Sequence, residues 1–522
     1  MIEVKENIID KAVRFVAPVH AAKRFRARAF MAYAGAYAGA SYSRRPTKQW
    51  VTTRGDADSD IIDDLPTLRE RSRDLCRNAP IAIGAVSTAL TNTIGTGLKL
   101  QSRIDREYLR ITDEQADAWE SSVEREFRLW AESVECDAAR SLTFALIQEL
   151  AFRQVLENGD VFALTPRFRR GKWPYMLKLQ LVEADRVCNE NNAANKDGLI
   201  EGIEKNDNGE ATAYHILQQH PGSDWVTKKM FRWVKVPAYG DKTGLRNVIH
   251  LFRMIRPGQS RGVPYLAPVI EPLKQLDRYT EAELMAAVLA SMFTVFIETE
   301  SGDTDFDVSG MGEETGAETS DTDMKLASGA IVGLAKGQKI QTANPGRPNT
   351  AFDPFVTAIL QQIGAALEIP YEIIVRHFSA SYSASRAALL EAWRFFRGRR
   401  AWMAANFCQP VYEIFLYEAV AAGRIAAPGY FADPMIQKAY QGSLWVGDAP
   451  GYIDPAKDIT AAKERMDAGV STLDEETTLI TGGDMEQNIP RIRKERKLLK
   501  EIGLWIPKET KPKAPAQGGT EE

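Results

Sequence analysis

The hydrophobic pattern is clearest in residues 255–292, which read IRPGQSRGVPYLAPVIEPLKQLDRYTEAELMAAVLASM. The start of this stretch, with Gly258, Arg261 and Gly262, predicts a structural turn that a helix could not pass through. Prolines then lead into a helix start, where the missing N–H costs no hydrogen bond. Apolar residues recur at helical spacing from Leu273 to Met292, which predicts a long helix over 271–292. The β-branched and aromatic run FTVFIET (293–299) predicts a strand directly after it.

Helical periodicity recurs in other parts of the chain. A continuous pattern from Leu65 to Thr93 places Arg69, Arg71 and Arg73 on its polar positions. Thr112 and Gln115 form a capping-box pattern that predicts the start of the next helix. Further helices are predicted over 141–158, 355–369, 383–422 and 491–504, the last of them strongly basic.

The pattern changes to strands between 159 and 254. Strand-like runs are GDVFALTPRF, YMLKLQLVEADRVCN, ATAYHILQQH and NVIHLFRMI, and NDNG (206–209) predicts a hairpin turn. The stretch 329–343 is again strand-like. Helical and strand-like regions together predict an α+β fold.

Composition limits the class of protein. The 522 residues are 44% hydrophobic and 26% charged, typical of a globular protein with several structural units. A net charge of −4 argues against a simple basic DNA-binding protein. The four cysteines form no CxxC pair, so we expect neither a disulfide framework nor a zinc site. No apolar run reaches 18 residues, and we expect no membrane partner.

Two segments have unusual charge. Residues 1–54 carry eleven Lys/Arg and three acids, which fits either a solvated flexible arm or a contact with nucleic acid or another subunit. Residues 298–323 carry ten Asp/Glu and no Lys or Arg. This composition predicts a solvated, flexible insertion.

Three motifs resemble chemical sites without completing one. GQSRG (258–262) matches the Gly-x-Ser-x-Gly pattern around a nucleophilic serine, but His377 is the one histidine downstream of Ser260. Asp303, Asp305, Asp307 and Glu314 have the acid spacing of a calcium loop, but Val308 replaces the required glycine. GLAKGQK (333–339) lacks the spacing of a phosphate loop. We therefore expect no catalytic residue, metal or cofactor.

The densest basic patch away from the ends of the chain is RFFRGRR (394–400). Arg394, Arg397, Arg399 and Arg400 could form a solvated face or pair with acids of a neighbouring subunit. They could also contact DNA phosphates.

Several phrases resemble the lambda-type phage portal family. These are LVEADRV, GIEKNDNGEATAYHI, VIHLFRMIRPGQSRGVPYLAPVIEPLKQLDRY and SYSASRAALLEAWR, followed by Trp, Asp-Pro and Gly-x-Ser-Thr within 445–476. They occur in the family's order over about 150–500. The competing interpretation is a hydrolase or nuclease built on GQSRG or on the acid cluster, and neither constellation is complete.

The resemblance implies a ring of about twelve subunits at one vertex of a phage head. Double-stranded DNA is packaged through such a ring by the terminase motor and later ejected. Major capsid and scaffold proteins, terminase and head-completion (head-tail connector) proteins are the implied partners. The implied locations are the host cytoplasm during assembly and then the virion.

The resemblance also implies a portal fold with an α/β wing, a long stem helix, a β-containing clip and a helical crown. A portal has a second stem helix after its clip, for which we find room only around 311–328. The loop with Asn344, Arg347 and Asn349 would face the DNA channel. The expected parts are a basic arm (1–55), wing (56–255), turn and stem helix (256–292), clip with the acidic insertion (293–335), wing strands, channel loop and helix (336–377), crown and its support (378–505) and tail (506–522).

Overall fold

The computed structural model describes residues 45–52, 54–225, 231–291, 295–299, 338–342, 351–378, 381–451 and 454–502, with a few positions before residue 41. The chain divides into two units, Met1–Asp60 and Ile61–Glu522. Most of the predicted basic arm and acidic insertion, and the calcium-like loop, lie outside the described residues.

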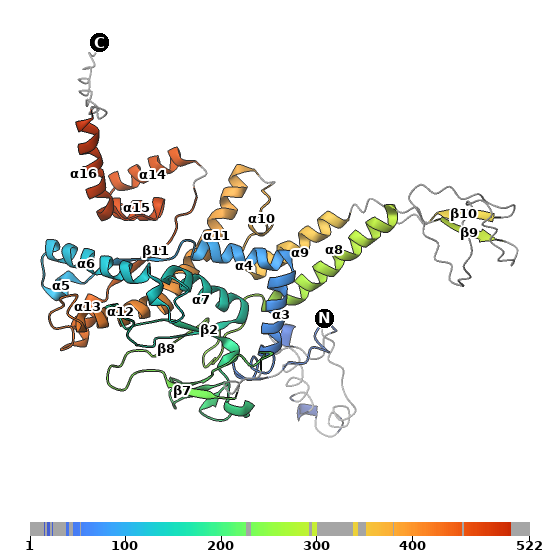
Figure 1. The fold of residues 1–522 in the computed structure, drawn as a ribbon. Coiled ribbons are helices and arrows are strands. Elements are labelled where there is room, and N and C mark those ends of the chain that lie inside the picture. The colour runs from blue at the N-terminus through green and yellow to red at the C-terminus, as the bar shows by residue number, and fades with distance from the viewer. Residues whose placement is uncertain are drawn as a thin grey trace, which may run out of the picture. The chain divides into compact units, whose positions relative to one another are not determined.

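The second unit combines helices and short strands (Figure 1). Its α-helices are α3 (Leu65–Asn78), α4 (Pro80–Thr93), α5 (Arg106–Leu109), α6 (Asp113–Ala131), α7 (Phe144–Asn158), α8 (Ile270–Ser291), α9 (Phe352–Ala366), α10 (Tyr371–Ile374), α11 (Tyr382–Met403), α12 (Gln409–Ala421), α13 (Pro434–Tyr440), α14 (Pro455–Asp467), α15 (Leu473–Thr481) and α16 (Met485–Glu501). Its strands are β1 (Lys99–Ser102), β2 (Asp160–Leu164), β3 (Gln180–Glu183), β4 (Leu199–Ile200), β5 (Ile203–Lys205), β6 (Ala211–Leu217), β7 (Trp233–Pro237), β8 (Val248–Phe252), β9 (Val295–Thr299), β10 (Gln338–Thr342) and β11 (Ser443–Val446). The predicted α+β content is confirmed.

Local signals explain where several helices begin and end. The capping box at Thr112 is present in both directions, and α6 begins at the next residue. The single helix predicted over 65–93 is wrong, because the chain breaks between α3 and α4. Ala79 has extended backbone angles there, since Pro80 disfavours a helical conformation in the residue before it.

The main antiparallel sheets lie in the region expected to form the wing. β2 pairs with β3 on one side and with β8 on the other, and β4–β7 form a four-stranded sheet in chain order. The predicted turn at 206–209 connects β5 to β6. Because side chains alternate along a strand, Val161 and Ala163 enter the large core while Phe162 enters a second core against β5 and β6.

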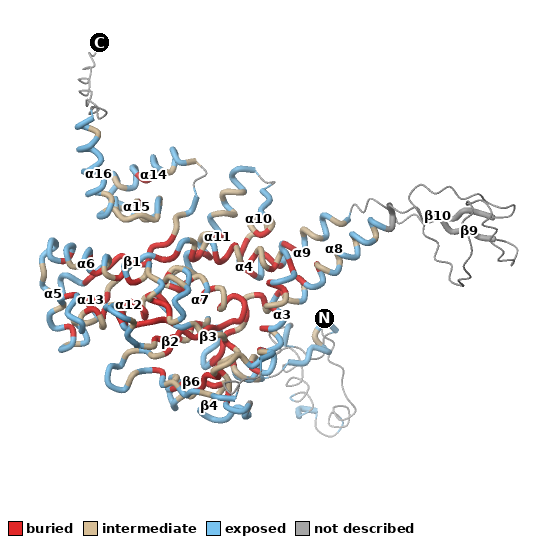
Figure 2. Tube along the Cα trace, in the orientation of Figure 1, coloured by how far each residue is buried: buried red, intermediate tan, exposed pale blue. Residues whose placement is uncertain are grey.

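The large core extends into the region expected to form the crown. Phe127 of α6 makes edge-on contacts with Phe144 of α7, Phe415 of α12 and Trp445 of β11. β11 also pairs antiparallel with β1, which joins residues 99–102 to 443–446. Figure 2 shows in red the buried positions of these elements. The helices α11 and α12 therefore share one core with α4, α6 and α7.

The helix α8 is followed by a hairpin and a returning helix. β9 pairs antiparallel with β10, so the strand that the sequence predicts for the wing within 336–377 pairs with the strand after α8. Tyr279 of α8 stacks on Phe352 of α9 with ring centroids 5.6 Å apart, and its ring meets Phe355 edge-on. The helix that runs beside α8 is therefore α9 (Figure 1), and 311–328 lies outside the described residues.

Candidate functional site

The turn before α8 is closed by its own glutamine. Gln259 Oε1 accepts hydrogen bonds from the backbone N–H groups of Ile255 and Arg256, at 2.9 and 3.2 Å. Its Nε2 donates to the carbonyl of Arg261 at 2.7 Å. Gly258 has φ +84, a left-handed angle that favours glycine. The turn is thus hydrogen-bonded internally: residues 255–258 are exposed, whereas Gln259, which is 1% exposed, and the residues up to Gly262 are buried.

Gly262 is required for a different reason, the close approach of two backbones. A Cβ at Gly262 would lie 2.0 Å from the carbonyl oxygen of Gly159, and a Cβ at Gly159 would lie 2.4 Å from the carbonyl oxygen of Gly262. Both glycines therefore permit the turn to pack directly on the segment between α7 and β2. This contact could not be predicted from the local sequence of either glycine.

Arg261 is fully buried and all its guanidinium nitrogens are used. Its Nε donates to Asp160 Oδ2 at 2.6 Å and its Nη2 to the carbonyl of Ala184 at 2.8 Å. Its Nη1 donates to the carbonyls of Val187 and Glu201, at 2.8 and 3.1 Å. One side chain thereby ties the turn to β2 and to the segments after β3 and β4.

Two further side chains complete the cluster around Asp160. Arg69 Nη2 donates to Asp160 Oδ1 at 2.9 Å, and His250 Nε2 lies 3.3 Å from Oδ2. The prediction that Arg69 lies on a polar helix face is wrong, because its side chain is 5% exposed and points to β2. Arg69 and Asp160 were both missed as site residues. The available signal was an acid that opens a hydrophobic strand directly after a glycine.

The electrostatics of this cluster favour fixed charges. Burial would raise the pKa of Asp160, but the adjacent guanidinium groups of Arg261 and Arg69 hold that pKa well below its usual range. Burial lowers the pKa of His250, although Asp160 opposes this. Asp160 therefore remains ionised and His250 neutral near pH 7, which suits an anchor better than a site that exchanges protons.

Ser260, the serine of the Gly-x-Ser-x-Gly pattern, lies inside this turn. It is 2% exposed, and its neighbours Gln259 and Arg261 are each 1% exposed. A nucleophile must reach its substrate, which this burial opposes.

The four arginines of 394–400 do not form one patch. Arg394 and Arg397 are exposed on α11, and Arg394 Nη1 lies 3.1 Å from Glu391 Oε2. Arg399 instead lies over the ring of Phe395, with its guanidinium carbon 4.7 Å from the ring centroid.

Arg400 stabilises the end of another helix. It donates to the backbone carbonyls of Asn92 and Thr93, both at 3.1 Å, and to that of Asp448 at 2.9 Å. These carbonyls at the end of α4 have no partner within the helix, and a cation there is favourable. Arg400 is therefore occupied inside its own subunit.

The predicted channel loop with Asn344, Arg347 and Asn349 lies outside the described residues. Its flanks are β10 and α9, so it joins the hairpin to the helix that returns along α8.

Within the described residues, one group has the composition of a metal site. Ligand atoms of Glu183, Asp185 and His220 lie within 4.8 Å of one another. Arg73 Nη1 already donates to Asp185 at 2.6 Å and to Glu183 at 3.1 Å. His220 Nδ1 accepts from the N–H of Gly222, which places the proton of the neutral ring on Nε2, toward the carboxylates. The group is thus satisfied as a hydrogen-bonded ion-pair network.

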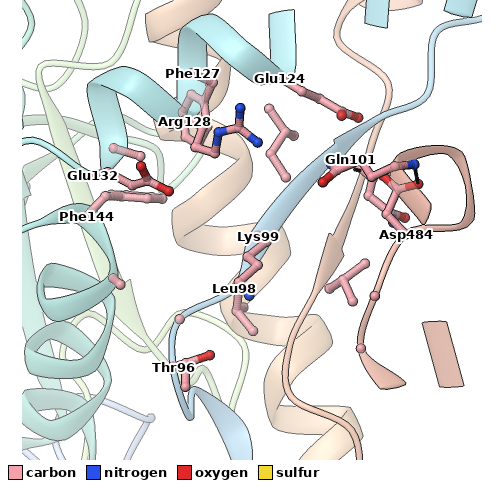
Figure 3. Close-up of a pocket in the computed structure, with 18 of the residues that line it drawn as sticks. Thr96, Leu98, Lys99, Gln101, Glu124, Phe127, Arg128, Glu132, Phe144 and Asp484 are labelled. Atoms are coloured by element: carbon pink, nitrogen blue, oxygen red, sulfur yellow. Dashed lines mark hydrogen bonds between the residues drawn. The ribbon is translucent and has the colours of Figure 1, made fainter. Parts of the chain in front are cut away.

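A cavity of about 500 Å³ lies between β1, α6, α7 and the start of α16. Figure 3 shows Glu124 and Arg128 of α6 and Asp484, which precedes α16, among its lining side chains. Burial, together with the nearby carboxylates of Asp484, Glu486 and Glu120, raises the pKa of Glu124 to about 7. Its Oε1 accepts the N–H of Ser102 at 2.8 Å, which opposes the rise.

Among the described helices, none is both long and apolar enough to cross a membrane.

Comparison with known proteins identifies the family. The family model described as phage portal protein, lambda family, matches residues 43–400. The chain is 25% identical over 464 residues to portal protein B of Escherichia phage lambda, covering 85% of this chain and 86% of that protein. It is 26% identical over 465 residues to the portal protein of Escherichia phage N15, with the same coverage. It is 24% identical over 481 residues to a probable portal protein of Halomonas phage phiHAP-1, covering 89% of this chain and 86% of that protein.

Among solved structures, the chain is similar to one from the virion of a native gene transfer agent particle. That match has a TM-score of 0.42 and 14% identity, and covers 80% of this chain and 92% of the other. A chain from the neck of the native particle, computed with C12 symmetry, matches with a TM-score of 0.40 and 13% identity over 78% of this chain and 92% of the other. The family match spans more than half of the sequence and includes the turn, β2, α8 and α9. The chain belongs to the lambda family of phage portal proteins.

Proposed function

We propose that about twelve copies of this chain form a ring at one vertex of a phage head. The ring conducts double-stranded DNA inward during packaging and outward during ejection. Membership of the portal family is the observation that carries this proposal, since the match extends over residues 43–400. In this role a terminase motor docks on the ring first, and head-completion proteins replace it.

The parts of the chain are assigned by analogy with the family. α8 and α9 are the two stem helices, which replaces our expectation of a second stem helix around 311–328. The hairpin β9–β10 belongs to the clip, where the motor docks. The loop with Asn344, Arg347 and Asn349 faces the channel, and the helices after 378 supply the crown and its support. The Arg261–Asp160 cluster gives α8 a rigid base, because forces on the stem are then transmitted to the β2 sheet through buried bonds.

The net charge of the chain supports a channel through which DNA slides rather than a site that holds DNA tightly. A channel with many cations would hold phosphates tightly, and affinity would rise with each contact. A chain with a net charge of −4 avoids such retention. We propose no enzymatic activity, cofactor or metal for this chain, since the motor supplies the energy of packaging.

The decisive experiment is electron microscopy of the purified full-length protein. We expect rings with an open axis and a rotational symmetry near twelvefold. Monomers or closed globular particles at all protein concentrations would contradict the proposal. Capsid and scaffold proteins can then be added, with rings expected at one vertex per particle.

A further inference from the structure

The helix α16 is well formed but buries none of its 17 residues. Figure 2 shows it exposed along nearly its whole length. Isolated helices of this length are marginal in water, because most helix stability in proteins comes from packing. Pro490 lies inside α16 and weakens it further, since proline removes one hydrogen bond of the helix. These features indicate that α16 acts with a partner.

The first turn of α16 is nevertheless fixed to the rest of the unit. Asp484 caps the helix by accepting from the N–H groups of Glu486 and Gln487, at 2.8 and 3.3 Å. Arg103, just after β1, lies 2.6 Å from Asp474 of α15 and 3.8 Å from Glu486. The helix therefore starts from a defined position, and its later turns are available for contact.

Those later turns carry a concentrated positive charge. Residues 491–501 contain six Lys/Arg and two Glu, a net charge of +4 on a chain whose total is −4, and Glu501 lies 4.0 Å from Lys497. Arg493, Lys494, Lys497 and Lys500 are spaced i, i+1, i+4 and i+7, so they share one side of the helix. All four are exposed. We call these four residues the basic face of α16.

We propose that the basic face of α16 binds the phosphate backbone of double-stranded DNA, without reading its sequence. The four cations extend over about 10 Å of the helix axis. Over the same length duplex DNA presents about six phosphates. Binding phosphates would also relieve the mutual repulsion of cations three and four residues apart. This inference rests on the proposed portal function, which brings DNA to the subunit.

The narrow apolar stripe of α16 favours DNA over an anionic membrane surface. The apolar stripe beside the basic face consists of Ile489, Ile492 and Leu499, of which Leu499 is only partly exposed. Helices that lie in a membrane surface present a broad apolar face. The wider, positively charged side of α16 is instead typical of a contact with phosphates.

The test is DNA binding by the full-length protein over a series of salt concentrations. The variant carries Arg493→Gln, Lys494→Gln, Lys497→Gln and Lys500→Gln, since glutamine keeps the helix propensity of lysine. The control removes the same charge from exposed residues in separate segments, as Arg71→Gln, Lys172→Gln, Lys196→Gln and Lys242→Gln. A mixed-sequence DNA duplex is the probe, and circular dichroism checks that both variants keep their helix content.

We expect the basic-face variant to reduce the slope of log affinity against log salt by about 3.6, about 0.9 for each of the four charges removed, with a weaker affinity at every salt concentration. The control should lose much less of the slope. Equal slopes for the basic-face variant and the control would overturn the inference, as would binding of wild-type protein to anionic vesicles but not to DNA. Electron microscopy of the same samples separates the two proposals. If rings form but the basic-face variant and the control bind DNA alike, only the proposed role of α16 is contradicted. If the wild-type protein forms no rings, the portal function is contradicted.

Discussion

Arg261 and Asp160 form an ion pair in which Nε and Oδ2 are 2.6 Å apart and neither side chain is more than 1% exposed. The pair connects the turn before α8 to the first residue of β2, 101 residues earlier in the chain. Arg69, 91 residues before Asp160, also pairs with it. One carboxylate thus contacts two buried guanidinium groups, and Asp185 lies 3.6 Å from that of Arg69.

Asp160→Asn should lower the free energy of unfolding by about 3–5 kcal/mol, because it removes the carboxylate that contacts the buried Arg261 and leaves Arg69 with Asp185, 3.6 Å away. The folded-state pKa of Asp160 is depressed, so its contribution is present above the unfolded pKa near 4 and is lost as the pH falls further. The deficit should therefore be full at pH 7 and shrink below about pH 4. Urea unfolding at pH 7 and at a pH below about 4 measures this deficit. Asp207→Asn, in the exposed turn after β5, is the control variant. Equal stability of the two variants at pH 7 would show that Asp160 is not the counter-ion.

The two glycines of the turn should respond differently to alanine. Gly262→Ala should cost at least about 3 kcal/mol, because its Cβ would meet the Gly159 carbonyl and backbone must move. A Cβ at Gly258 would meet no neighbouring atom, so Gly258→Ala is opposed by the positive φ alone. We expect it to lower the free energy of unfolding by about 1–2 kcal/mol. Thermal unfolding of both variants gives the comparison. A larger loss for Gly258→Ala would show that the backbone angle, not the close approach, limits the turn.

Glu124→Gln should flatten the dependence of stability on pH between about 5 and 7. The pKa of Glu124 is raised to about 7, so the folded state holds a proton that the unfolded state releases near pH 4. Wild-type stability should therefore decrease as the pH rises through this window, and glutamine removes the effect while still accepting from Ser102. Unfolding measured at each pH checks the slope. An unchanged slope in the variant would assign the titration to another carboxylate of the cavity.

Arg347→Glu should allow rings to form but reduce the DNA packaged or retained per particle. If the loop faces the channel, about twelve copies would oppose phosphates with carboxylates instead of meeting them with cations. Arg347→Ala should be milder, since removing an attraction costs less than adding a repulsion. DNA content per particle, beside ring counts by microscopy, distinguishes the variants. If particles with Arg347→Glu hold as much DNA as the wild type, the proposal that this loop faces the channel is wrong.

Ser260→Ala should leave phage yield unchanged apart from a small loss of stability. The serine is 2% exposed inside the turn, so a reaction at its hydroxyl would require the turn to open. Phage yield and esterase activity are the measurements. Normal rings with a large loss of yield would favour the hydrolase interpretation again.

Local sequence was sufficient for the elements whose signals are themselves local. The capping box at Thr112, the turn at 206–209 and the helix after the prolines near 270 depend on residues within a few positions of one another. The family resemblance also came from short ordered phrases, and the family match over 43–400 agrees with it. The break at Pro80 was equally local, and we missed it because apolar periodicity continues across it.

Only the tertiary structure decided which distant segments meet. The pairing of β1 with β11, of β9 with β10, and of Asp160 with Arg69 and Arg261 each joins residues far apart in the chain. Hydrophobic periodicity reports which side of an element is buried but not what covers it, and a charged residue at a polar-looking position can still be buried when its partner lies elsewhere. The sequence by itself therefore determined the family and most local elements, while long-range packing decided that Arg69 and Arg400 point inward and that α9 runs beside α8.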